Sequence, residues 1–222
     1  METKALKTTI IVMALLFAVY AFFNNPFTGS SQPPSSSAIC MDYSKDKPNT
    51  LRHSLVTELV KNYKNNQLVA IQTALVNAVP NDSQCIWFEL DSLKKFIYHI
   101  EKGFEVNKPG AKGSLGLRMY YAAYPQDTLW GTKGYEELAA LSKDPTTAKY
   151  DRKHTLVLIP TLKIHGINAD FNPIDATTYT GFNSSTNPFS NPNYVPMALS
   201  ASVMAKNHGR LQPPYPTAGN AF

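Results

Sequence analysis

The sequence predicts an α+β domain, in which a small mixed β-sheet packs with two to four helices, preceded by one N-terminal transmembrane helix or signal segment. An apolar run opens the chain, and helix-period and strand-period patterns then alternate along its middle. The 222 residues include 16 prolines, more than a compact helical protein carries. Hydrophobic residues make up 43% and charged residues 17%, so the chain has enough apolar material for a core.

The N-terminus has the pattern of a secretion or membrane signal. Residues 1–7 carry Lys4 and Lys7 against Glu2, and residues 8–23 contain no charged side chain. Positive charge before an apolar stretch keeps residues 1–7 in the cytoplasm and sends the following chain across the bilayer. We therefore expect residues 8–23 to lie in the lipid bilayer of a bacterial inner membrane, with the globular domain in the periplasm.

The apolar stretch leaves two alternatives open. Val19-Tyr20-Ala21 offers small or modest side chains to a signal peptidase, and cleavage there would give a secreted protein. Continuation of the run through Phe22 and Phe23 favours an uncleaved anchor, because crossing a bilayer takes about 20 residues.

A tether and a domain follow the anchor. Residues 24–48 are rich in Ser and Pro and predict an extended spacer, residues 49–214 predict the globular domain, and residues 215–222 form a tail. The two cysteines, Cys40 and Cys85, could pair in an oxidising compartment, which would contribute on the order of 4 kcal/mol. The alternative leaves Cys40 free and makes Cys85 a small buried residue.

Helical spacing predicts the first element of the domain. Apolar residues recur over residues 51–63, with Asn49 or Thr50 as the N-cap, and again over residues 68–79. This predicts one long helix or two short ones, ended by Pro80.

A strand and a helix come next. Residues 85–90 (CIWFEL) predict a short strand, and Asp91 is expected to cap an amphipathic helix. We expect the apolar face of this helix to pack on the strand that contains Trp87. That face comprises Leu93, Phe96, Ile97, Ile100 and Phe104.

The later elements are strands and loops. Residues 115–124 predict a strand, residues 156–159 a buried strand stopped by Pro160, and His165-Gly166 the turn of a hairpin. Loop sequence separates the first two, with a short helix around residues 135–141. A final short helix is expected over residues 194–206.

Candidate polar chemistry centres on a carboxylate, an arginine and a tyrosine. Glu89 and Asp91 flank the strand-to-helix corner, while Arg118, Tyr120 and Tyr121 lie on the following strand. Such groups could bind a polar ligand or perform acid–base work, or they could form a structural ion pair. His154 at a strand entrance and His208 near the C-terminus are the candidate bases, or else surface residues.

Metal and cofactor motifs are weak. The five histidines show no HxH or HExxH pair. Asp170, Asn172 and Asp175 bring oxygen ligands together as a calcium site requires, but the glycine and glutamate of an EF-hand loop are absent. Turn capping is the alternative interpretation. The sequence predicts no cofactor, and a net charge of +5 without a dense basic run argues against nucleic-acid binding.

Four segments resemble a recurring pattern in a family of uncharacterised proteins from Bacteroidota bacteria. They are residues 85–101 (CIWFELDSLKKFIYHIE), 115–121 (LGLRMYY), 154–161 (HTLVLIPT) and 207–214 (NHGRLQPP), so the resemblance covers roughly residues 50–214. It implies no established activity. Members of that family often have a cysteine where Gln212 stands, which weakens any thiol or metal role for this tail.

Two classes of function fit the sequence. The first is a membrane-tethered, extracytoplasmic binding or structural module of the bacterial cell envelope, whose partner is an envelope protein or a glycan. The second is an extracytoplasmic hydrolase or metal-dependent enzyme. Its candidate site would comprise Glu89, Arg118, Tyr120, His154 and His208. Convergence of Arg118, His154 and His208 on one pocket would favour an enzyme, and dispersal would favour a module.

Overall fold

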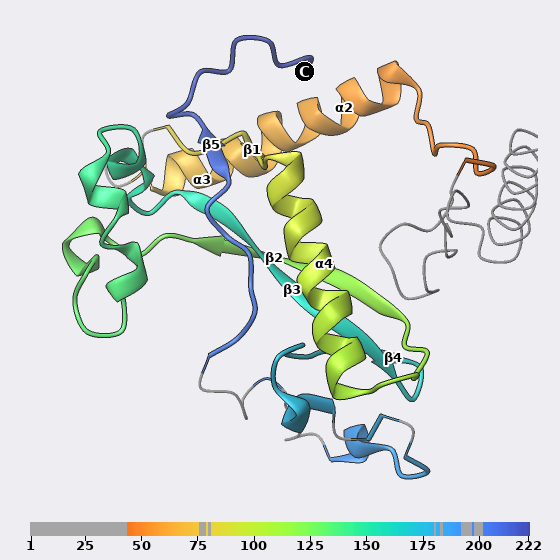
Figure 1. The fold of residues 1–222 in the computed structure, drawn as a ribbon. Coiled ribbons are helices and arrows are strands. Elements are labelled where there is room, and N and C mark those ends of the chain that lie inside the picture. The colour runs from red at the N-terminus through yellow and green to blue at the C-terminus, as the bar shows by residue number, and fades with distance from the viewer. Residues whose placement is uncertain are drawn as a thin grey trace, which may run out of the picture. The chain divides into compact units, whose positions relative to one another are not determined.

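The predicted α+β class is confirmed by a computed structural model that describes residues 44–75, 79, 81–179, 181–182, 184–191, 197 and 202–222. Helices combine with a two-stranded sheet, β1-β5, and a three-stranded sheet, β2-β3-β4 (Figure 1). The prediction of one mixed sheet was wrong. Every strand pair is antiparallel, and β1 pairs with β5 instead of joining the larger sheet.

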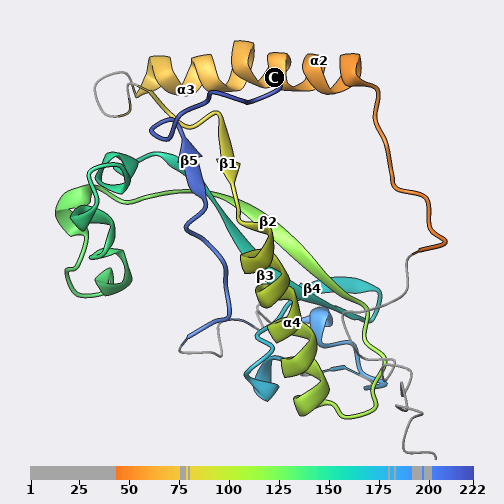
Figure 2. The ribbon, with the colours of Figure 1, turned by 45° about the horizontal axis from the view of Figure 1, so that its top comes forward.

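The first helical stretch is continuous. α2 (His53–Tyr63) passes through a π-helical turn (Lys64–Leu68) into α3 (Val69–Ala74), and Figure 2 shows α2 and α3 as one straight run. Arg52 takes the N-cap position without a side-chain hydrogen bond, so the expected cap at Asn49 or Thr50 was wrong.

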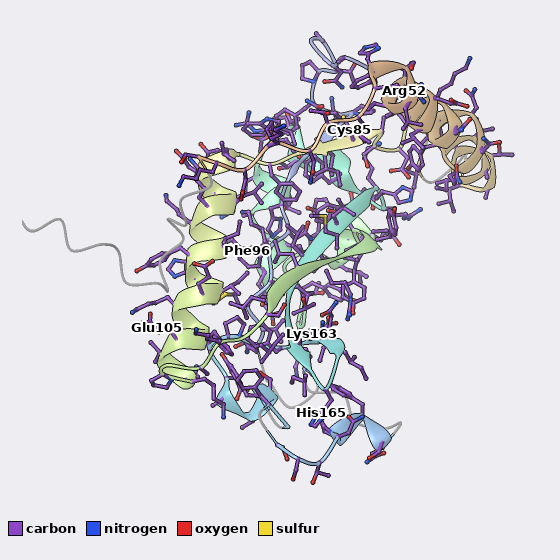
Figure 3. All side chains as sticks on the ribbon, turned by 90° about the vertical axis from the view of Figure 1, so that its right-hand side faces the viewer. Arg52, Cys85, Phe96, Glu105, Lys163 and His165 are labelled. Atoms are coloured by element: carbon purple, nitrogen blue, oxygen red, sulfur yellow. The ribbon has the colours of Figure 1, made fainter. Side chains whose placement is uncertain are left out.

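α4 (Leu90–Asn107) buries the predicted apolar stripe, with Phe96, Ile100 and Phe104 in the main core. The stripe packs with Leu158, Leu162 and Ile164 of β3, and Figure 3 shows Phe96 on the side of α4 that faces the sheet. The expected packing on the strand that contains Trp87 was wrong, because the Trp87 ring is 47% exposed and lies against Arg210. Glu89, without a side-chain cap, is the N-cap, and Asp91 instead forms a surface ion pair with Lys94.

The larger sheet is a meander of β2 (Leu115–Ala123), β3 (His154–Ile164) and β4 (Ile167–Asp170). The predicted hairpin turn at His165-Gly166 is confirmed. Both residues have positive φ, 47° and 81°, as a type I′ turn requires.

β3 continues through Pro160, so the expected end of this strand at the proline was wrong. The Leu158 N–H donates to Lys206 O, and the Pro160 carbonyl accepts from the Phe171 N–H. The even-numbered residues of β3 therefore direct their backbone N–H and C=O groups away from β2. A proline at this register therefore costs no hydrogen bond to β2, although it pairs with Leu117 there.

β1 (Cys85–Trp87) and β5 (Arg210–Gln212) join distant parts of the chain. Leu211 of β5 is fully buried in a second cluster with Tyr124, Trp130, Leu141 and Tyr150. The approach is so close that a Cβ at Gly209 would lie 2.3 Å from Ile86 Cγ2, which only glycine avoids.

The connections contain short 3₁₀ turns instead of helices. They span Asp127–Leu129, Glu136–Leu138, Leu141–Lys143, Thr147–Tyr150, Ala176–Tyr179 and Pro188–Ser190. Most of the helix expected over residues 194–206 lies outside the described residues. Met197 is in a 3₁₀ turn, whereas residues 202–206 are not helical and Lys206 forms a β-bridge with Leu158.

The expected anchor, residues 8–23, and Cys40 lie outside the described residues. Within the described part of the chain, no helix has the length and apolar character needed to cross a bilayer. Both the spanning helix and the disulfide stay predictions. The Cys85 side chain is exposed, which contradicts the alternative of a small buried residue.

Candidate binding site

The predicted arginine–tyrosine–carboxylate cluster exists, but its acid is Asp170. Arg118 and Tyr120 point from the same face of β2, and both donate hydrogen bonds to the Asp170 carboxylate on β4. Arg118 Nη2 also donates to Asn168 O at 2.5 Å. The strand register explains the choice of acid, because β2 and β4 both pair with β3, which places Asp170 across β3 from Arg118 and Tyr120, while Glu89 lies at the start of α4. All these polar groups are partnered within the sheet, which fits a structural ion pair.

His154 pairs with an acid that sequence reasoning missed. Its Nδ1 hydrogen-bonds to Asp82, whose side chain is buried and also accepts from the backbone N–H groups of Ser83 and His154 at 2.7 and 2.9 Å. A buried carboxylate orients an imidazole in this way in many catalytic sites. No Ser, Thr or Cys side chain in the described residues hydrogen-bonds to the His154 ring.

The candidate calcium ligands have separate structural roles. Asp170 serves Arg118 and Tyr120, the Asn172 amide bonds to Ser202 O and Met204 N, and Asp175 accepts from Thr177. Asp175 therefore shows the turn capping given above as the alternative. Among the described residues, no group of three or more His, Cys, Asp and Glu side chains could hold a metal ion.

Two of the predicted residues, Glu89 and His208, meet in one cavity of about 230 Å³. Glu89 arrives from the start of α4, whereas His208 precedes β5, and the pairing of β1 with β5 brings the two segments together. His208 has φ of +61°, a strained conformation for a residue with a Cβ. The full lining comprises Trp87, Phe88, Glu89, Ser92, Lys206, His208 and Arg210.

Two cations are held in place inside this cavity. Lys206 Nζ donates to Ser92 Oγ at 2.7 Å and lies 6.0 Å from the centroid of the Phe88 ring. The Arg210 guanidinium lies 4.9 Å from the centroid of the Trp87 ring and 5.4 Å from that of the Tyr215 ring, so it forms cation–π contacts with both rings. Among the described residues, no acid forms an ion pair with either cation.

The electrostatic balance of the cavity is positive. Lys206 and Arg210 outnumber Glu89, and the 18-residue α4 begins there without a side-chain cap. An uncapped helix N-terminus presents free N–H groups and a partial positive charge. Desolvation, and then the charge of Lys206, lower the pKa of His208, although much of the residue is exposed at the rim. His208 is therefore a neutral hydrogen-bonding group at neutral pH.

A second cavity of about 400 Å³ is less suited to a charged ligand. Its lining comprises Val79, Asn81, Lys149, Asp151, Lys153, Pro213 and Pro214. Lys153 donates to Asn81 O and interacts with Asp82 and Asp151, and desolvation lowers its pKa. The Lys153 ammonium group therefore already interacts with groups of the protein itself.

Arg118, His154 and His208 do not converge. They have different partners: Asp170 for Arg118, Asp82 for His154 and Tyr124 for His208. Of these three residues, only His208 lines either of the two cavities described above.

Comparison of the chain with protein-family models, with curated proteins and with solved structures found no match.

Proposed function

We propose that the chain is a membrane-tethered, extracytoplasmic binding module of the bacterial cell envelope, and that the cavity beside α4 binds an anionic glycan. The carrying observation is that Lys206, Arg210 and the N-terminus of α4, which has no side-chain cap, line one cavity, where Arg210 contacts two aromatic rings. Residues 8–23 would supply the anchor and residues 24–48 the tether.

The chemistry of the lining indicates the ligand class. Arginine and lysine bind carboxylate or phosphate groups through charge-assisted hydrogen bonds, and helix N-termini favour the same anions. Trp87 and Phe88 add apolar ring faces next to these cations. A sugar with a carboxylate or phosphate group presents both an anion and a C–H face, so it fits both parts of the lining.

The test is calorimetric titration of the full chain with three probes: tetragalacturonate, glucose 6-phosphate and the neutral maltotetraose. We expect one or both acidic probes to bind, weakening as salt is raised, and maltotetraose not to bind. Arg210→Gln should lower the affinity by about 10- to 150-fold, since a hydrogen bond to a charged group contributes about 1.5–3 kcal/mol.

Lys149→Gln is the matched control, because it removes the same charge from the other cavity. It should leave the affinity unchanged. Equal binding of the neutral probe, no binding of either acidic probe, or equal losses in the two variants would each refute the proposed site. The acidic probe that binds identifies the anion as carboxylate or phosphate.

A hydrolase is the second candidate, and it rests on the Asp82–His154 pair alone. Hydrolysis of chromogenic esters that is lost in His154→Gln and kept in His165→Gln would favour it.

A further inference from the structure

β2 is an edge strand whose outer side is open. The Ser114 carbonyl accepts from Lys163 N and the Tyr124 N–H donates to Lys153 O, so even-numbered residues direct their backbone groups to β3. Odd-numbered residues therefore direct their N–H and C=O groups outward. These residues are Leu115, Leu117, Met119, Tyr121 and Ala123, and no backbone group in the described part of the chain pairs with their outward side.

The edge also lacks the usual protection against pairing. Protective devices on edge strands are proline, lysine, bulges and unpaired charges. β2 contains one charged residue, Arg118, which is neutralised by Asp170, and contains no proline or lysine. Three of its large side chains are open to solvent, with Tyr121 88%, Met119 57% and Tyr120 42% exposed.

We propose that this edge binds a second copy of the chain, with the two β2 strands antiparallel about a two-fold axis at Met119. Met119 is the central residue of the nine in β2, so this register pairs the whole strand. Its five outward-facing residues would form about ten hydrogen bonds, two for each hydrogen-bonded pair. The two three-stranded sheets would become one continuous sheet.

Side-chain pairing across the axis indicates a second copy as the occupant. Leu117 would lie opposite Tyr121 of the other copy, and Arg118 opposite its Tyr120. Arg118 already donates to Tyr120 within one chain, at 3.4 Å, so the two side chains are suited to each other. An axis at Arg118 would also pair odd-numbered residues with each other, but it would place the two Arg118 side chains opposite each other, and like charges directly opposed are destabilising. The strand is therefore self-complementary about Met119.

The decisive test is a disulfide between the two copies. The full chain in mild detergent carries Met119→Cys in a background with Cys40→Ser and Cys85→Ser, and is oxidised. Facing Cα atoms in a hydrogen-bonded pair are about 5.5 Å apart, which a disulfide can span. We expect a covalent dimer. Val106→Cys, at a 64% exposed position of α4, should stay monomeric in the same background.

Light scattering provides the second measurement. The parent should be a dimer, Met119→Lys a monomer because two lysines would face each other at the axis, and Val106→Lys a dimer. A monomeric parent at the highest soluble concentration, a dimer that survives Met119→Lys, or equal cross-linking at residues 106 and 119 would overturn the proposal.

Discussion

Two buried tyrosines form hydrogen bonds to backbone groups through their hydroxyls. The Tyr179 hydroxyl donates to Pro173 O at 2.8 Å, and the Tyr150 hydroxyl accepts from the Leu211 N–H at 3.1 Å. Each tyrosine is 2% exposed, and burial raises the pKa of each to about 12. The neutral phenol is therefore the form that the folded chain requires.

These tyrosines predict a loss of stability at high pH. In the unfolded chain a tyrosine ionises near its ordinary pKa of about 10. The free energy of unfolding should therefore hold up to pH about 10 and fall as the pH rises from 10 towards 12, by on the order of 2 kcal/mol per tyrosine. Denaturant unfolding at a series of pH values measures this fall.

Tyr179→Phe separates the two contributions of that residue. It should cost about 1 kcal/mol at neutral pH, through the lost hydrogen bond, and should flatten the alkaline fall. Tyr98→Phe on the exposed side of α4 should change neither quantity. An unchanged alkaline slope in Tyr179→Phe would show that this phenol does not control the transition.

Some contacts of single residues could be predicted from the sequence and others could not. The Arg118–Tyr120 pair was recognisable because alternation along one strand places both on one face. Asp82 could not be assigned to His154, since 72 positions separate them and no periodic pattern surrounds Asp82. Lys206 and Arg210 were missed as cavity residues for the same reason, although the segment that contains Arg210, residues 207–214, had been singled out.

At the scale of single elements, α4 is the best test of the packing. Phe96→Ala should cost about 3–5 kcal/mol, because it leaves a void between α4 and β3. Typical domains have only about 5–15 kcal/mol of stability, so thermal melting should show a large decrease in Tm. Lys95→Ala on the exposed face should change stability by less than about 0.5 kcal/mol. Equal melting temperatures for Phe96→Ala and the parent would mean that α4 is not docked on the sheet.

Elements long enough for their apolar pattern to repeat several times were predictable, and short elements were not. α4 repeats its apolar stripe over 18 residues and β2 alternates over nine, so both appeared at nearly their observed bounds. β5 has three residues, and its strand character exists only through pairing with β1. The number of sheets depends on that one pairing, which explains why a single mixed sheet was expected.

At the scale of the whole molecule, location is the prediction to test first. A reporter enzyme that is active only in the periplasm, fused after Ala38, should be active if residues 8–23 place the following chain outside the cytoplasm. A reporter active only in the cytoplasm, fused at the same residue, should be silent. The reverse pattern would remove the tethered envelope module and the Cys40–Cys85 disulfide together.

The pairing of β1 with β5 also sets an order of events during synthesis. Residues 85–87 pair with residues 210–212, which lie more than a hundred positions later in the chain. Leu211 of that later segment also completes the second cluster. Contacts between such distant residues form slowly, because a long loop must close first. A nascent chain can close this domain only after residue 212 has emerged from the ribosome. If residues 8–23 send the chain through a secretion channel, the β1–β5 pair and the second cluster would form only after residues 210–212 have followed, so this part of the domain would still be open while the earlier residues pass.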